Sequence, residues 1–177
     1  FHLLEASRRL PRNVQTVLCA SAPDTPEIEA RLRAAVAELP GVLWINEMVP
    51  LEVVTQLYSH AAVFACPSVY EPFGIINLEA MACRTAVVAS AVGGIPEVVV
   101  PDETGLRVPL EIRPGTFDPV DPAAFSADLA AAINRVGLDA ALRDHFGAAG
   151  RSRVEAHFSW AAIARQTLDL YASVARG

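Results

Sequence analysis

The hydrophobic positions of the chain fall into short apolar runs, separated by longer segments in which apolar residues recur every three to four positions. Short runs rich in β-branched residues are typical of buried strands, and the longer spacing is typical of one face of a helix. The runs predict strands at residues 14–20, 42–45, 63–66, 86–90 and 104–108. The periodic segments predict helices at residues 1–10, 26–38, 50–60, 75–82, 96–100, 122–136, 138–157 and 158–175. Thr25, Asp121 and Ser159 stand just before three of these helices and are expected to cap them.

Strands that alternate with helices in this way indicate an α/β fold built on a doubly wound parallel sheet. Residues 110–122 show no periodicity and are expected to form a surface loop. No internal repeat, low-complexity tract or linker divides the sequence, so we expect residues 1–177 to form a single domain. The first predicted helix begins at Phe1 with no start signal, which indicates that the chain begins within a helix.

The composition argues against several kinds of site. The formal net charge is −6 with both signs interspersed, so nucleic-acid binding and an anionic-membrane surface have no support. The sequence has no lysine and all 14 basic residues are arginine, which excludes a Walker lysine and a Schiff-base lysine. The three cysteines stand singly in apolar contexts, so reduced thiols are expected rather than disulfides or a metal site. No apolar run is long enough to span a bilayer and no signal peptide is visible, so we expect a cytoplasmic protein.

One stretch carries the candidate chemistry. Residues 67–83 read PSVYEPFGIINLEAMAC and predict the end of a strand, a turn and the start of a helix. Gly74 falls where the helix opens, so bare backbone N–H groups and the positive end of the helix dipole favour a phosphate or pyrophosphate there. Glu71 precedes the helix, and Glu79 lies five residues beyond Gly74, about 7.5 Å along the helix axis. Because carboxylates accept hydrogen bonds from sugar hydroxyls, an anion site between two of them fits a nucleotide sugar.

Two glutamates near a helix start are also common as solvated residues that stabilise the helix dipole. The surrounding residues favour the functional interpretation, because the stretch resembles the E-x7-E signature of retaining glycosyltransferases with the GT-B fold. The resemblance continues through residues 85–99 and 104–109 and, more loosely, over nearly all of the chain. Within that family, VYEPFGIINLEAMAC is most similar to the glycogen synthase and maltose-1-phosphate synthase branch.

The resemblance implies a Rossmann-like carboxy-terminal domain that binds the donor, ADP-glucose or UDP-glucose, with no metal and no separate cofactor. It implies that Glu71 contacts the transferred sugar, while the backbone around Phe73, Gly74 and Ile75 holds the sugar and the diphosphate. It also implies that Glu79 holds the ribose hydroxyls. A retaining reaction by direct front-face attack needs no protein nucleophile, so Glu71 is interpreted as a residue that positions the sugar and stabilises charge.

The resemblance covers one half of a two-domain enzyme. An α-glucan or glucose 1-phosphate acceptor, together with a catalytic histidine, would belong to an amino-terminal domain outside this sequence. The nucleotide base would lie near Met48 and Val49, although both could equally be ordinary loop and core residues. Open alternatives are a mannosyl- or sucrose-phosphate-type transferase and a stand-alone nucleotide-binding module without activity. The oligomeric state is also open, a homodimer included.

The family pattern also places a strand ahead of Phe1. In the strand order 3-2-1-4-5-6 this strand is central, between the predicted strands 14–20 and 63–66. Its loss would leave unpaired backbone groups that cost about 1–3 kcal/mol each when buried. We therefore expect that the flanking strands pair directly, that a neighbouring chain supplies a strand, or that the sequence is a piece of a longer chain. An isolated chain with both edges unpaired and a strand's width apart would contradict this strand order or the placement of the first helix.

Overall fold

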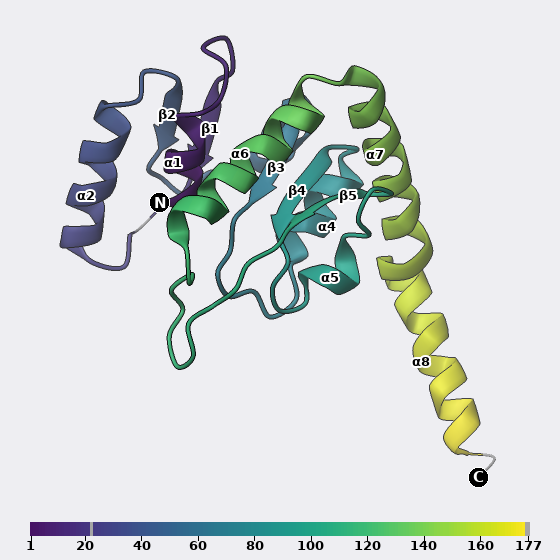
Figure 1. Ribbon diagram of the computed structural model, residues 1–177. Coiled ribbons are helices and arrows are strands. Elements are labelled where there is room, and N and C mark those ends of the chain that lie inside the picture. The colour runs from purple at the N-terminus through teal and green to yellow at the C-terminus, as the bar shows by residue number, and fades with distance from the viewer. Residues whose placement is uncertain (22, 176–177) are drawn as a thin grey trace.

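The computed structural model describes residues 1–21 and 23–175, along which strands and helices alternate (Figure 1). The strands are β1 Thr16–Cys19, β2 Val42–Ile45, β3 Val63–Cys66, β4 Ala86–Ser90 and β5 Gly105–Val108. The helices are α1 His2–Ser7, α2 Pro26–Ala37, α3 Leu51–His60, α4 Ile75–Ala82, α5 Ile95–Val98, α6 Pro122–Gly137, α7 Ala140–Arg153 and α8 Trp160–Val174. The predicted α/β class is confirmed, and β2, β3 and β4 have the predicted bounds.

All strand pairs are parallel, but they form two separate groups. β1 pairs with β2, whereas β3, β4 and β5 pair in that order. The strands β1 and β3 are not paired with each other in the part of the chain that the structure describes. Direct pairing of these two strands, which was one of the three expected outcomes, is therefore wrong. The sheet is thus interrupted between β1 and β3. These are the two strands between which the predicted order 3-2-1-4-5-6 places a further strand.

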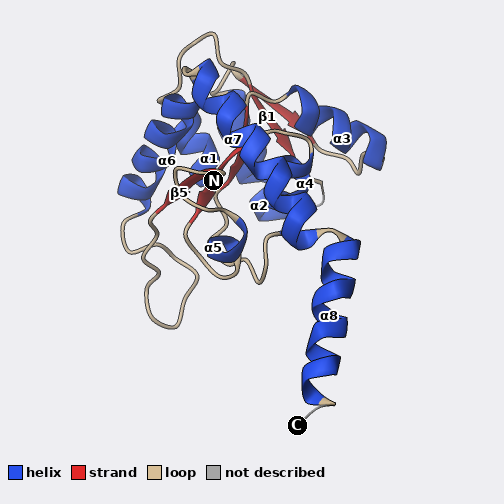
Figure 2. Ribbon diagram, turned by 90° about the vertical axis from the view of Figure 1, so that its right-hand side faces the viewer, coloured by secondary structure: helices blue, strands red, loops and turns tan. Residues whose placement is uncertain are grey.

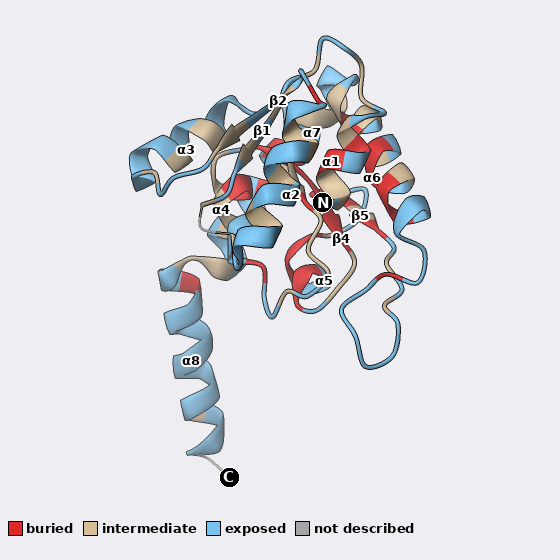
Figure 3. Cartoon of the chain, turned by 90° about the vertical axis from the view of Figure 1, so that its left-hand side faces the viewer, coloured by how far each residue is buried: buried red, intermediate tan, exposed pale blue. Residues whose placement is uncertain are grey.

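The core lies on both faces of the three-stranded sheet. All five residues of β4 are buried (Figure 3), and successive side chains point to opposite faces. Ala86 and Val88 belong to a cluster with α1, α6 and Phe146 of α7. Val87 and Ala89 belong to a second cluster with α4 and α5. Helices therefore cover both faces around β4, as expected of a doubly wound sheet.

The three predicted N-caps are confirmed. The Thr25 hydroxyl accepts a hydrogen bond from the backbone N–H of Ile28 at 3.3 Å. Asp121 Oδ1 accepts from the N–H groups of Ala123 and Ala124 at 3.0 and 2.9 Å. The Ser159 hydroxyl accepts from the N–H of Ala162 at 3.2 Å. Each bond satisfies a backbone donor that the first helical turn leaves free, which is why these helices begin at these residues.

Asp121→Ala is expected to lower the free energy of unfolding by about 1 kcal/mol, because two amides at the start of α6 lose their acceptor. The measurement is urea unfolding followed by circular dichroism. Asp128→Ala is the matched control, since this carboxylate lies on the same helix and forms no ion pair within the described residues. Equal destabilisation by the two substitutions would show that lost charge, and not lost capping, is responsible.

The carboxyl-terminal part differs from the predicted helices. The helix predicted at 138–157 is α7, capped by Asp139, followed by a π-helical segment Val154–Phe158. Helix α8 then extends away from the rest of the chain (Figures 1 and 2) and is exposed along most of its length. Residues 110–121 form a loop as expected, with an isolated antiparallel bridge between Ile112 and Pro119, whereas Pro122 is the first residue of α6. Within residues 1–21 and 23–175, no helix has the length and apolar character needed to cross a bilayer.

Candidate functional site

The turn between β3 and α4 lies at the carboxyl end of a parallel strand, where ligands of open α/β sheets bind. Gly74 is the N-cap of α4 and has a φ of 100°, a conformation that favours glycine. Its N–H donates a hydrogen bond to Glu71 Oε1 at 3.0 Å. A Cβ atom at position 74 would lie 2.9 Å from Asn77 Nδ2. The predicted placement of Gly74 at the helix opening is confirmed, and Glu71 binds the N–H of this N-cap residue.

The loop between β4 and α5 packs against the backbone of this turn. The N–H of Gly94 donates to the backbone oxygen of Glu71 at 3.0 Å. Gly93 has a φ of 54°, and a Cβ atom there would overlap the same oxygen. A Cβ atom on Gly94 would lie 2.6 Å from the Cα atom of Phe73. The contact of these two glycines with the Glu71 backbone was not predicted from the sequence.

Two polar side chains fix the start of the turn. Ser90, the last residue of β4, donates from its buried hydroxyl to the backbone oxygen of Ser68 at 2.5 Å. Asn77 is completely buried, and its Nδ2 donates a weak hydrogen bond to Cys66 Sγ at 3.7 Å. Asn77 Oδ1 has no hydrogen-bond partner within the described residues. The turn is thus held to β4 and to α4 as well as to its own strand.

Glu79 lies on α4 and is partly buried. The hydroxyl of Tyr58, on α3, donates to Glu79 Oε2 at 3.1 Å. Burial, and after it the neighbouring Glu79 carboxylate, raises the pKa of the Tyr58 phenol, so the phenol stays protonated at neutral pH. Nothing in the sequence spacing indicated this hydrogen bond, which joins two residues 21 positions apart.

Apolar side chains surround the turn. Phe73 and Ile75 are 38% and 60% exposed, respectively. The Phe73 ring meets the Phe158 ring edge-on, with 6.1 Å between centroids. The Arg153 guanidinium lies over the Phe158 ring, 5.5 Å from its centroid, and donates to the backbone oxygen of Val98 at 3.0 Å. Phe158 of the π-helical segment therefore contacts the turn, and Arg153 at the end of α7 contacts both Phe158 and α5.

Met48 and Val49 follow β2, which belongs to the other sheet. Met48 is 86% exposed, and its Sδ accepts a hydrogen bond from the hydroxyl of Ser21, just after β1, at 3.0 Å. No hydrogen bond or aromatic contact joins either residue to the turn in the described part of the chain. The structure therefore brings Glu71, Phe73, Gly74, Ile75 and Glu79 together on one turn and helix, and leaves Met48 and Val49 at a separate strand end.

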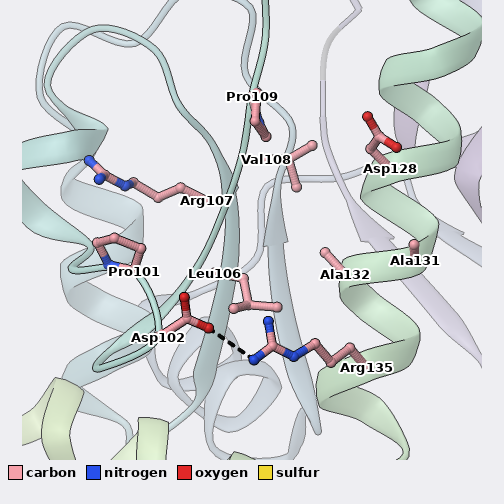
Figure 4. Close-up of a pocket in the computed structure, with 10 residues that line it drawn as sticks. All are labelled: Pro101, Asp102, Leu106, Arg107, Val108, Pro109, Asp128, Ala131, Ala132 and Arg135. Carbon is pink, nitrogen blue, oxygen red and sulfur yellow. Dashed lines mark hydrogen bonds and ion pairs between the residues drawn. The ribbon is translucent and has the colours of Figure 1, made fainter.

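Two pockets formed by described residues lie elsewhere on the chain, and the turn lines neither of them. One, of about 330 Å³, lies between β5 and α6 and contains an ion pair between Asp102 and Arg135 at 2.9 Å (Figure 4). The other, of about 460 Å³, adjoins it beside the 110–122 loop. Both side chains of this ion pair are solvent-exposed, and exposed ion pairs contribute little to the free energy of unfolding. Neither pocket is lined by Glu71, Gly74 or Glu79.

The arrangement at the turn has the parts needed to hold an anion between two hydrogen-bond acceptors. The amino end of α4 carries the positive end of the helix dipole, and Gly74, which has no side chain, is its N-cap. Glu71 lies before that end and Glu79 lies beyond it along the same helix. Carboxylates in such positions accept hydrogen bonds from hydroxyl groups on either side of a bound phosphate.

The chain is similar in sequence to known glycosyltransferases. A family model described as glycosyl transferases group 1 matches residues 2–135, which include the turn. The alpha-maltose-1-phosphate synthase of Mycolicibacterium smegmatis is 50% identical over 177 residues, covering 98% of this chain and 44% of that protein. The enzyme of the same name from Mycobacterium tuberculosis strain H37Rv is also 50% identical over the same share. The chain thus spans less than half the length of these relatives.

Solved structures show the same architecture. Sucrose-phosphate synthase from Thermosynechococcus elongatus superposes with a TM-score of 0.77 at 37% identity, covering 98% of this chain and 41% of that one. Anabaena HepE, solved in complex with UDP-glucose, superposes with a TM-score of 0.76 at 22% identity, covering 97% and 44%. Because the identity to HepE is 22%, this similarity shows the shared fold alone. The sequence match, the fold and the turn agree, and the chain belongs to the glycosyl transferase group 1 family, with the α/β fold of a GT-B carboxy-terminal domain.

Proposed function

We propose that residues 1–177 form one nucleotide-sugar-binding domain, the donor-binding half of a retaining glucosyltransferase. The donor is ADP-glucose or UDP-glucose, and the acceptor is an α-glucan or glucose 1-phosphate. The observation that carries the proposal is the turn itself, in which Glu71 accepts a hydrogen bond from the Gly74 N–H before α4 and Glu79 lies on that helix. The 50% identity to alpha-maltose-1-phosphate synthase supports the choice of glucose and of the glycogen pathway.

The residues act as follows in this proposal. The diphosphate binds at the amino end of α4, where Gly74 permits close approach of the backbone. Glu79 accepts hydrogen bonds from the ribose hydroxyls. Glu71 accepts from hydroxyls of the transferred glucose and stabilises the positive charge that develops as the bond to the diphosphate breaks. The acceptor attacks from the face that the diphosphate leaves, so configuration is retained without a protein nucleophile. Met48 and Val49 are proposed to lie near the base.

The proposal is tested first by binding. Isothermal titration of the intact protein with ADP, UDP, ADP-glucose and UDP-glucose is expected to show saturable binding of one nucleotide series. Product analysis with that donor and glucose 1-phosphate or glycogen is then expected to show a new α-linked glucosyl unit. A protein that binds none of the four ligands would contradict the proposal.

Residues 1–177 alone are expected to give no glucosyl transfer. The proposed acceptor site lies outside this segment, and catalysis needs both reactants positioned together. The measurement is release of ADP or UDP and formation of product, on a sample whose circular dichroism shows folded α/β structure. Turnover by this segment would show that it carries an acceptor site of its own.

A second candidate is a transferase of a different sugar or acceptor. The 37% identity to sucrose-phosphate synthase favours this alternative, since the turn would serve any donor built on a nucleoside diphosphate. A panel that includes GDP-mannose as donor and fructose 6-phosphate as acceptor separates the candidates.

A third candidate, a nucleotide-binding module without activity, predicts binding of the nucleoside diphosphate with no transfer to any acceptor. All three predict a cytoplasmic location, with which the three unpaired cysteines, all in the described part, are compatible.

A further inference from the structure

Tyr58 forms a side-chain hydrogen bond from a neighbouring helix to one of the two carboxylates of the site. Its hydroxyl donates to Glu79 Oε2 at 3.1 Å, across the contact between α3 and α4 (Figure 2). Within the described residues, Glu79 Oε1 has no hydrogen-bond partner. One oxygen of the carboxylate is therefore held by the protein, and the other is open to a ligand.

The phenol is held rigidly enough to fix that carboxylate. The Tyr58 ring meets the ring of Phe64 edge-on, with 5.2 Å between centroids and an interplanar angle of 84°. The backbone oxygen of Tyr58 accepts a hydrogen bond from the buried hydroxyl of Thr85 at 2.6 Å. Phe64 lies on β3, and Thr85 precedes β4 directly. The position of the hydroxyl is therefore set by the two strands that also set the position of the turn.

We propose that Tyr58 is a positioning residue for donor binding: its hydroxyl orients Glu79 so that the free carboxylate oxygen faces the ribose hydroxyls of the nucleotide. This inference rests on the proposed function, because it assigns Tyr58 a role toward the ribose that Glu79 is proposed to hold. A glutamate side chain on a helix surface otherwise samples several rotamers, and ordering it on binding costs free energy. A rotamer fixed in advance by Tyr58 removes that cost.

A purely structural role for the hydroxyl predicts a different result. In that case Tyr58→Phe destabilises the contact between α3 and α4, and every ligand of the site is weakened alike. A positioning role predicts that the loss depends on the ribose hydroxyls. The informative probes are therefore ADP or UDP, whichever the protein binds more tightly, and the 2′,3′-dideoxy form of the same nucleoside diphosphate.

Tyr58→Phe in the intact protein is expected to raise the Kd of the normal nucleotide about five- to tenfold, the effect of losing one ordered hydrogen bond, and that of the dideoxy form less than about twofold. In a Glu79→Ala background the same substitution is expected to change neither value. Tyr171→Phe, which removes the hydroxyl of an exposed tyrosine on α8, is the matched control and should bind both nucleotides as the wild type does.

Equal weakening of the two nucleotides, or an unchanged Kd for the normal one, would overturn the positioning role while leaving the proposed function intact. A wild-type protein that binds neither ADP nor UDP would instead overturn the proposed function, and the inference with it. Urea unfolding of Tyr58→Phe, run in parallel, shows whether any loss of binding reflects unfolded protein.

Discussion

Glu71→Ala in the complete enzyme is expected to lower kcat about 100- to 1,000-fold, with little change in donor affinity. The magnitude is that of removing one group that stabilises charge in a transition state. The proposed position of Glu71 explains why kcat falls while donor affinity changes little. Glu71 lies at the amino end of α4, where the reacting sugar is proposed to bind, whereas the nucleotide is proposed to bind further along the helix. The measurement is steady-state kinetics combined with direct titration of the nucleoside diphosphate.

The alanine variant also removes the acceptor for the Gly74 N–H, so a lower kcat alone does not separate chemistry from a disturbed turn. Glu71→Gln separates them, because a glutamine oxygen still accepts that hydrogen bond but carries no charge. We expect Glu71→Gln to lose nearly as much kcat as Glu71→Ala. If Glu71→Gln retained wild-type kcat, the role of Glu71 would be confined to its hydrogen bond with the Gly74 N–H.

Glu79→Ala provides the complementary comparison. Hydrogen bonds to a charged group contribute about 1.5–3 kcal/mol, so losing the ribose contact is expected to weaken nucleotide binding about 10- to 150-fold. The value of kcat at saturating donor should fall much less than in Glu71→Ala. Unchanged donor affinity and turnover in both variants would show that the turn is not the donor site.

Gly93→Ala is expected to lower the free energy of unfolding by about 2–5 kcal/mol and to weaken donor binding. A residue with a side chain pays about 1–2 kcal/mol to adopt a left-handed backbone, and forced overpacking adds about 1–3 kcal/mol. At position 93 both costs apply, because φ is 54° and the new Cβ atom would overlap the backbone oxygen of Glu71. This overlap is relieved by a shift of the Glu71 backbone, and Glu71 is the residue that carries the proposed chemistry.

Gly115→Ala is the matched control for this prediction. Gly115 also has a positive φ, 75°, but a Cβ atom there would have no atom within 4 Å. Its substitution should therefore cost only the conformational part, about 1–2 kcal/mol, with donor binding unchanged. Urea unfolding gives the stabilities, and calorimetric titration gives the affinities. The same loss of stability in both variants, with donor binding intact in both, would mean that the turn tolerates displacement of the Glu71 backbone.

Local features of the sequence determined most of the secondary structure. The apolar runs located β2, β3 and β4 at their observed bounds, because a strand buried on both faces needs a short uninterrupted run. Thr25, Asp121 and Ser159 located helix starts, because a cap is a contact between residues two or three positions apart. The turn at Gly74 could be predicted for the same reason, since its glycine, its two glutamates and its helix lie within one short stretch.

Only the tertiary structure decided which distant residues support that stretch. Tyr58 reaches Glu79 from another helix, and Gly93 and Gly94 press against the Glu71 backbone from the next loop. The absence of pairing between β1 and β3 in the described part of the chain likewise depends on the three-dimensional placement of the strands. Such contacts join residues many positions apart, so no periodicity or local preference along the chain encodes them. They depend on how helices and strands pack, and this packing converts a recognisable sequence motif into a site with fixed geometry.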